Sequence, residues 1–197
     1  MEVARKKDVG LRERILQASL EMTADPDFVN FTTAKIAKAA GVSEGTLYNY
    51  FENKGHLFQN LFEYSFDQYF EELKEYISNE NDIREKLKRI LKYHISYFAE
   101  TNKVFRLIFL AGDNATSPFR VITKILPAYK DFISETLNKH KDELNKNINP
   151  DFIASFILGS VQILVLQEIV YPKKMDLDKA IEHLYRMLSQ YLFKVEK

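Results

Sequence analysis

Cysteine is absent from this sequence, and glycine and proline are scarce, with six and five residues in a chain of 197. Without cysteine the chain has no disulfide framework, no thiolate nucleophile and no Cys-ligated zinc site. Such a chain is compatible with the reducing interior of a cell. The Asn-Gly and Asp-Gly pairs that favour tight hairpin turns are also missing. Apolar residues recur with a period near 3.6 instead of alternating, so the sequence predicts an all-α protein without strands.

Neither sign of charge is in excess, because 28 basic residues balance 28 acidic ones. Net charge therefore gives no argument for a nucleic-acid partner, which has to be argued from geometry instead. A long hydrophobic run is missing too, since the most apolar stretch, 152–170, is interrupted by polar residues and falls short of the roughly 20 that a bilayer requires. Residues 1–10 lead into no signal-peptide core. We expect a cytoplasmic protein that does not enter a membrane.

What the sequence does contain is a helical pattern typical of a globular protein, with 46% apolar and 28% charged residues. Asn53 and Asp176 are predicted N-caps, and Ser117 and Asn149 each precede a proline that would take the first helical position. About nine helices follow from these signals and from the apolar period. They cover roughly 9–23, 33–40, 43–51, 53–77, 83–98, 103–110, 118–138, 150–171 and 177–192.

The most informative segment is 32–51, with the sequence TTAKIAKAAGVSEGTLYNYF. Two short helices are separated there by one turn, and Ile36 and Ala40 on the first would meet Leu47 on the second. Gly41 stands where the turn favours a left-handed backbone, and Ser43 would cap the second helix. A short, capped helix that is exposed on its other side suits entry into a DNA major groove.

This segment resembles the TetR family of transcription regulators, and the likeness extends over about residues 8–65. It is carried by Thr33, Ile36-Ala37, Ala40-Gly41-Val42-Ser43, Gly45-Thr46-Leu47-Tyr48, Tyr50-Phe51, Asn53-Lys54 and Leu57. The resemblance implies a three-helix DNA-binding domain at 1–52, with the helix-turn-helix at 32–51 inside a TetR-type region of about 8–68. It also implies an effector-binding and dimerisation domain at 53–197.

The resemblance implies DNA-binding roles for matching positions, and their chemistry agrees with those roles. Phosphate contacts fall to Thr33, Thr46, Tyr48, Tyr50 and Lys54, whose groups donate hydrogen bonds or charge. Glu44, Gly45 and Asn49 would face base edges, beside the capping Ser43. The alternative for the two tyrosines is simple packing. The basic residues at 5–7 are either an arm that reaches the DNA or a solvated tail.

Members of the resembled family normally carry an effector pocket among their middle helices, and aromatic residues are frequent there in this chain. The candidate effector-binding residues are Phe66, Tyr69, Phe70, Tyr93, His94, Tyr97, Phe105, Phe109, Phe119 and Gln162. Polar groups that would orient a ligand are His94, Arg106, Asn114 and Gln162, which favours an apolar or amphipathic effector. The alternative is that the aromatic residues form an ordinary core.

The last two predicted helices indicate a homodimer. The eighth is apolar almost all round and needs cover on every side, and the family resemblance implies a four-helix interface with a second copy. The four histidines lie on different helices without metal-ligand spacing, so we expect no metal site. No phosphate loop, nucleophile elbow or spaced acidic pair occurs, so we expect no cofactor and no enzymatic activity.

The sequence therefore predicts a repressor that is released from a palindromic DNA operator by a small apolar effector. One alternative is a dimeric DNA-binding protein without a small effector, acting in chromosome organisation or through a protein partner. A cavity between the fifth and seventh helices favours the first, and a filled core favours the second. A module that has lost DNA binding is disfavoured by the intact run 43–54.

Overall fold

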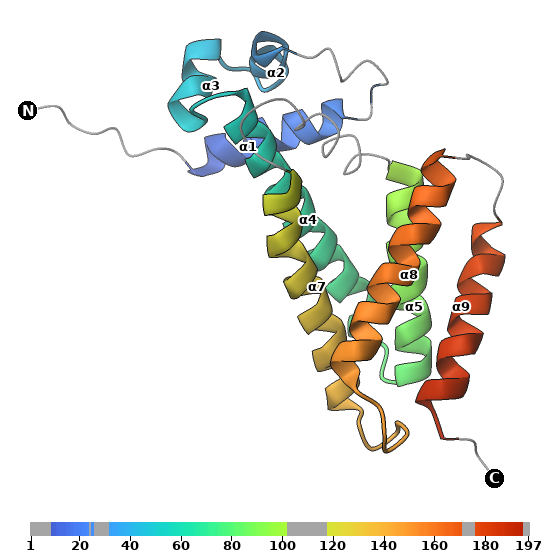
Figure 1. The fold of residues 1–197 in the computed structure, drawn as a ribbon. Helices are drawn as coiled ribbons and strands as arrows, with labels where there is room; N and C mark the ends of the chain where they lie inside the picture. Colours follow the sequence, from blue (N-terminus) through green and yellow to red (C-terminus); the bar gives the residue numbers. More distant parts are fainter. Residues whose placement is uncertain (1–8, 24, 26–31, 102–117, 171–175, 195–197) are drawn as a thin grey trace, which may run out of the picture. The chain divides into compact units, whose positions relative to one another are not determined.

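A computed structural model describes residues 9–23, 25, 32–101, 118–170 and 176–194 of the chain. This part is helical, as predicted, and its only extended pairing is an isolated antiparallel bridge between Leu144 and Phe193. The helices are labelled in Figure 1: α1 Val9–Met22, α2 Thr33–Ala39, α3 Glu44–Tyr50, α4 Lys54–Ser78, α5 Ile83–Thr101, α7 Pro118–Lys139, α8 Pro150–Val170 and α9 Leu177–Leu192. The helix expected at 103–110 lies outside the described residues.

Several helices begin at the residues that the sequence indicates. Asn53, Asn149 and Asp176 each accept a hydrogen bond from the backbone N–H three positions later, at 2.8, 3.1 and 3.1 Å. Each cap thereby satisfies one backbone donor that the first helical turn leaves without a partner. No helix within the described ranges is long and apolar enough to cross a membrane.

The chain divides into two compact units, and the division falls inside α4. The first unit contains residues 1–68 and 102–121, and the second contains 69–101 and 122–197. In the first unit, α1 packs on α2 and α2 packs on α3. The fully buried side chains there include Ile15, Ile36, Leu47, Phe51 and Leu61. Within α3 itself Leu47 is the buried residue, so the helix faces the core with one side.

The second unit is built around α5, which packs against both α8 and α9. In Figure 1 these three helices run along one another, with α7 beside α8. Ile83, Leu87 and Leu91 are almost fully buried, and Ile157 and Leu192 are fully buried. At one end, Asn145 donates its backbone N–H to the carbonyl of Leu192 at 2.8 Å, which ties the loop before α8 to the end of α9.

Candidate nucleic-acid interface and ligand site

The turn between α2 and α3 has a geometry that requires glycine. Gly41 has a φ of 68°, in the left-handed region, which confirms the prediction for this position. Its N–H bonds to the carbonyl of Lys38 at 3.1 Å, and the N–H of Val42 bonds to that of Ala37 at 2.9 Å. This pair of bonds is the Schellman arrangement that ends a helix and redirects the chain. The turn therefore sets how α3 leaves α2.

Helix α3 is capped and presents a polar face. The Oγ of Ser43 accepts the N–H of Thr46 at 3.1 Å and lies 2.8 Å from the Thr46 Oγ1. Gly45, Tyr48 and Asn49 are exposed on the side away from the buried core. A Cβ added at Gly45 would meet only the Ser43 Oγ, at 3.9 Å, so packing inside the protein does not require glycine there.

A hydrogen-bonded cluster joins the start of α2 to α3. The Thr33 Oγ1 donates to the Glu44 Oε1 at 2.5 Å and lies 3.2 Å from the Tyr48 Oη. Thr33 is 8% exposed, whereas Glu44 and Tyr48 are exposed. Sequence reasoning assigned these three residues separate roles toward DNA and missed their contact. The signal for it lies in the crossing of α2 over α3, which brings residues 11 and 15 positions apart together.

Two more predicted DNA contacts lie at the end of α3 and just beyond it. Tyr50 is half-buried, and Lys54, at the start of α4, is exposed with its Nζ 5.4 Å from the centre of the Phe58 ring. The basic residues at 5–7 lie outside the described residues. The roles of all these residues toward DNA stay predictions.

Five of the predicted effector residues meet in the second unit. The Tyr69 Oη and His94 Nδ1 are 2.6 Å apart, and both side chains are buried. The Tyr69 ring contacts Phe70, Tyr93 and Tyr97, with ring centres 5.4, 5.5 and 4.9 Å away. Complete burial lowers the pKa of His94 to about 3, so its ring is neutral at pH 7. The neutral imidazole of His94 is therefore a polar group within an otherwise aromatic, apolar region.

The edge of this cluster reaches solvent through Tyr93. Its hydroxyl donates to the Glu72 Oε2 at 2.6 Å, and burial together with this carboxylate raises its pKa. Burial and the same carboxylate raise the pKa of Tyr97 to about 12. On the inner side, the Tyr129 ring from α7 lies edge-on to His94 at 4.7 Å. Tyr129 is fully buried and was not among the predicted effector residues.

The other predicted effector residues lie apart from this cluster. Phe66 packs on Phe62 in the first unit, with ring centres 5.0 Å apart. Phe105, Phe109 and the two polar residues Arg106 and Asn114 lie outside the described residues, as does the side chain of Phe119. Gln162 lines a separate hollow on α8.

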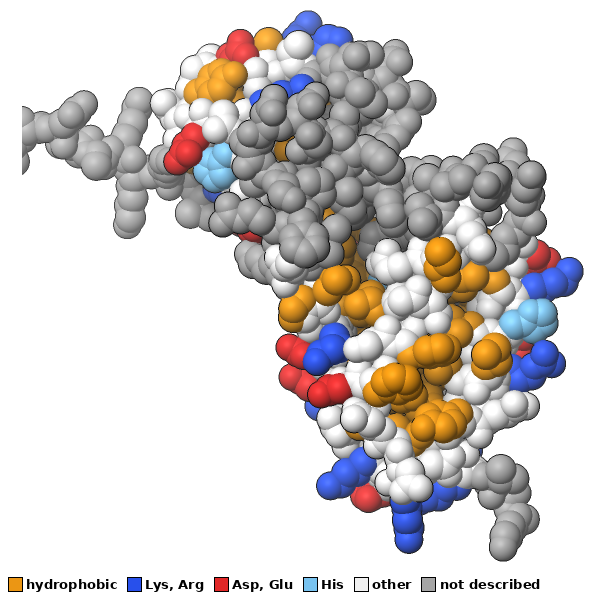
Figure 2. Space-filling view, in the orientation of Figure 1, with side chains coloured by type: hydrophobic (Ala, Val, Ile, Leu, Met, Phe, Trp, Pro, Cys, Tyr) orange, Lys and Arg blue, Asp and Glu red, His pale blue; other side chains and the backbone are white. Residues whose placement is uncertain are grey.

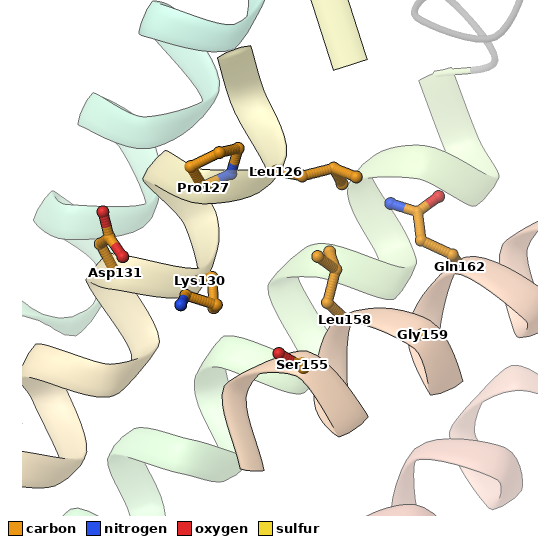
Figure 3. Close-up of a pocket in the computed structure, with 8 residues that line it drawn as sticks. All are labelled: Leu126, Pro127, Lys130, Asp131, Ser155, Leu158, Gly159 and Gln162. Carbon is orange, nitrogen blue, oxygen red and sulfur yellow. The ribbon is translucent and has the colours of Figure 1, made fainter. Parts of the chain in front are cut away.

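That hollow is a groove of about 500 Å³ between α7 and α8 (Figure 3). Eight residues line it: Leu126, Pro127, Lys130, Asp131, Ser155, Leu158, Gly159 and Gln162. The side chains of Leu126 and Gln162 extend toward each other from the two helices. Lys130 and Asp131 add one charge of each sign to a lining that is otherwise uncharged. Helical spacing within one element does not reveal such a groove, because it depends on which two helices lie side by side.

Exposed apolar side chains gather on α8 and α9, and Figure 2 shows hydrophobic side chains across this face. On α8 they are Phe152, Phe156 and Ile163, which are 64, 41 and 51% exposed. On α9 they are Met187 and Tyr191, which are 61 and 56% exposed. Aromatic and aliphatic groups this exposed, on two helices that both pack against α5, are typical of a surface that another molecule covers.

Known families match both parts of the chain. Residues 15–61 match the bacterial regulatory proteins of the tetR family, and residues 62–190 match the C-terminal region of the YsiA-like proteins. The chain belongs to the TetR family. It is therefore a TetR-type DNA-binding regulator, as the residues of the helix-turn-helix predict.

Individual relatives divide between two named roles. The chain is 26% identical to the fatty acid metabolism regulator protein of Bacillus subtilis, over 83% of this chain and 86% of that protein. It is also 26% identical to the nucleoid occlusion factor SlmA of Photobacterium profundum, over 96% of this chain and all of that protein. The structure of FadR from Bacillus subtilis in complex with stearoyl-CoA shares the fold, with a TM-score of 0.71, 24% identity and coverage of 89% of this chain and 96% of that one.

Proposed function

We propose that this protein is a repressor that binds a palindromic operator as a homodimer and is released by a fatty acyl thioester. The observation that carries the DNA-binding part is the polar, outward face of the capped helix α3. Gly45 and Asn49 lie on this face, and the turn at Gly41 orients it. A helix held from one side by a buried Leu47 leaves its other side to enter a major groove.

The residues of this face divide into two proposed roles. Thr33, Thr46, Tyr48, Tyr50 and Lys54 contact phosphates and fix the register on the duplex. Glu44 and Asn49 read base edges, since a carboxylate accepts from the cytosine amino group and an amide pairs with adenine. Gly45 lets the backbone of α3 approach the groove closely. The support is that most of these residues are exposed: Glu44, Gly45, Tyr48, Asn49 and Lys54. Thr46 and Tyr50 are half-buried, and Thr33 is buried but bonds to the exposed Glu44 and Tyr48.

The proposed dimer forms through α8 and α9. Their exposed apolar residues, from Phe152 and Phe156 on α8 to Met187 and Tyr191 on α9, need cover in water. A second copy offers the same residues, which a two-fold interface pairs with themselves. Two recognition helices related in this way suit half-sites about one or more helical turns of DNA apart.

The proposed effector is an amphipathic acyl thioester, such as an acyl-CoA. Support comes from the relatives, which include a fatty acid metabolism regulator and a FadR whose structure contains stearoyl-CoA. In this chain the groove of about 500 Å³ between α7 and α8 offers room for a ligand, whereas the buried cluster around Tyr69 and His94 is packed. The effector acts if it prefers the state that does not bind DNA, and a coupling of about 1 to 3 kcal/mol gives a 5- to 150-fold loss of operator affinity. The relatives are named as a regulator or as nucleoid occlusion factors, which supports a function without catalysis.

The test begins by selecting an operator from a randomised DNA pool. Lauroyl-CoA and stearoyl-CoA are then added, with CoA alone and free stearate as controls. We expect release of the operator by the thioesters and not by CoA alone. A thioester that binds tightly without changing operator affinity overturns the release mechanism, because equal affinity for both states shifts nothing.

The nucleoid occlusion factors among the relatives favour one alternative, a DNA-binding protein that acts in chromosome organisation without a small effector. Mapping the bound sites across the chromosome separates the two. A few sites upstream of genes support the repressor, and many sites with no thioester response support the alternative.

A further inference from the structure

The proton positions in the cluster of Thr33, Glu44 and Tyr48 follow from its chemistry. Glu44 is a carboxylate, which only accepts, so the single Thr33 hydroxyl proton goes to Glu44 at 2.5 Å. The Tyr48 hydroxyl lies 3.2 Å from the Thr33 Oγ1, and it must then be the donor to Thr33. The cluster is a directed chain in which Tyr48 donates to Thr33 and Thr33 donates to Glu44. In this state both hydroxyl protons point to partners inside the protein.

A phosphate oxygen is also only an acceptor, so it competes with Glu44 for the same proton. Thr33 is 8% exposed and its hydroxyl has one proton, so it cannot serve both anions at once. A DNA phosphate placed at Thr33 would also lie close to the Glu44 carboxylate, and like charges repel. Glu44 is exposed, so its side chain is able to leave while the backbone of α3 stays in place.

We propose that Glu44 is an internal competitor for DNA phosphate, which holds the Thr33 hydroxyl in the free protein and must give it up when DNA binds. This inference rests on the proposed use of Thr33 as a phosphate contact. It adds a positioning role to Glu44, which lowers affinity for any duplex through Thr33. The neighbouring pair Ser43 and Thr46 has no such charge, since both partners are neutral hydroxyls. Releasing Thr46 is therefore easier than releasing Thr33.

The experiment measures binding to a fluorescent duplex of about 30 base pairs with randomised sequence, at about 50 mM salt, where non-specific affinity is high. The variants are Glu44→Gln, Glu44→Ala, Thr33→Val and the two double variants, each with its melting temperature. We expect both Glu44 variants to raise affinity about three- to tenfold, since a charge-assisted bond no longer opposes the phosphate. In the Thr33→Val background, which has no hydroxyl to compete for, we expect less than about a twofold change.

Glu52→Gln is the matched control, because it removes an exposed carboxylate just after α3 that is not bonded to Thr33. Its effect should be the same in both backgrounds. An equal gain from Glu44→Gln in both backgrounds means simple charge repulsion and overturns the proposal. If Glu44→Gln lowers affinity, or leaves it unchanged, in the protein that retains Thr33, the proposal is overturned as well. If the unaltered protein binds no duplex at all, the proposed function fails instead, so the two failures are distinguishable.

Discussion

The two units place their polar and apolar groups in opposite ways. In the first unit, the hydroxyls of Thr33, Tyr48 and Thr46 bond to neighbours at or near the surface. In the second unit, the polar atoms of Tyr69 and His94 bond to each other inside an aromatic core. The exposed large apolar side chains of the described residues lie in the second unit, apart from Tyr48, which carries its own hydroxyl.

This difference teaches where each side chain should act. A surface hydroxyl can exchange its partner for water or phosphate at little cost, so changing it should affect binding more than folding. A buried polar group has no water to replace a lost partner, so changing it should affect folding. Changing the exposed apolar residues of α8 and α9, which together form an apolar stripe, should affect assembly with a second copy. DNA affinity, unfolding free energy and oligomeric state are therefore three separate readouts.

The largest effect is expected from a charge on the apolar stripe of the second unit. Ile163→Glu places a carboxylate at a position that is 51% exposed on α8, and burying it against a second copy would be costly. We expect monomers in sedimentation equilibrium and a loss of about 100-fold or more in operator affinity, because the two half-sites are no longer bound together. Glu135→Lys, at an exposed position on α7, is the control. A dimer that survives Ile163→Glu places the interface elsewhere.

The second effect concerns the buried histidine and pH. The unfolded chain binds a proton at His94 near pH 6.5, but the folded protein does so only near pH 3. Between these values the unfolded state holds more protons. The contribution of His94 to the free energy of unfolding is therefore complete above about pH 6.5 and falls as pH is lowered toward 3. Protonation at His94 lowers the free energy of unfolding by up to about 1.4 kcal/mol for each pH unit in this range.

Urea unfolding of the wild type and of His94→Phe from about pH 7 to about pH 4 isolates this contribution. The variant should lose stability at pH 7, because the hydrogen bond between Tyr69 and His94 is lost, yet it should show the shallower pH dependence. Its affinity for DNA at pH 7 should stay unchanged. Parallel pH curves for the two proteins would show that His94 is protonated in the folded state as easily as in the unfolded one.

The third effect is expected on DNA binding by the first unit. Gly45→Ala meets no obstacle inside the protein, where only the Ser43 Oγ is within 4 Å of the added Cβ. Alanine is the better helix former, so the free energy of unfolding should stay the same or rise by up to about 1 kcal/mol. Operator affinity should fall by about tenfold if the backbone of α3 lies against the groove. Unchanged affinity would assign no close approach to this position.

The features that sequence predicted well are those that depend on neighbours three or four residues away. Caps at Asn53 and Asp176 and the left-handed turn at Gly41 involve only local hydrogen bonds. A helix start or a Schellman turn therefore leaves a signature in the residue order itself. The family resemblance rests on the same local residues.

The features that sequence did not predict depend on which helices lie together. Helix α8 is apolar on every side, so its pattern does not say that Val161 is fully buried while Ile163 is half exposed. For the same reason the groove between α7 and α8 was not predicted, although Gln162 was named. The bond from Thr33 to Glu44 likewise needs the crossing of two helices. Periodicity reports faces within one helix and not their partners.

The smallest effect is expected from one surface charge of the first unit. Lys54→Ala removes an exposed ammonium that lies 5.4 Å from the centre of the Phe58 ring, so stability should change by no more than about 1 kcal/mol. If Lys54 contacts a phosphate, affinity should fall several-fold on operator and random DNA alike, and the slope of log K against log salt should drop by about one. Asn49→Ala, in contrast, should weaken operator binding more than random binding, since it removes a base contact and no charge. Lys139→Ala, an exposed lysine at the end of α7, is the matched control and should leave the slope unchanged. A weaker Lys54→Ala protein with an unaltered slope would mean that Lys54 acts through the structure of α4 and not through a phosphate.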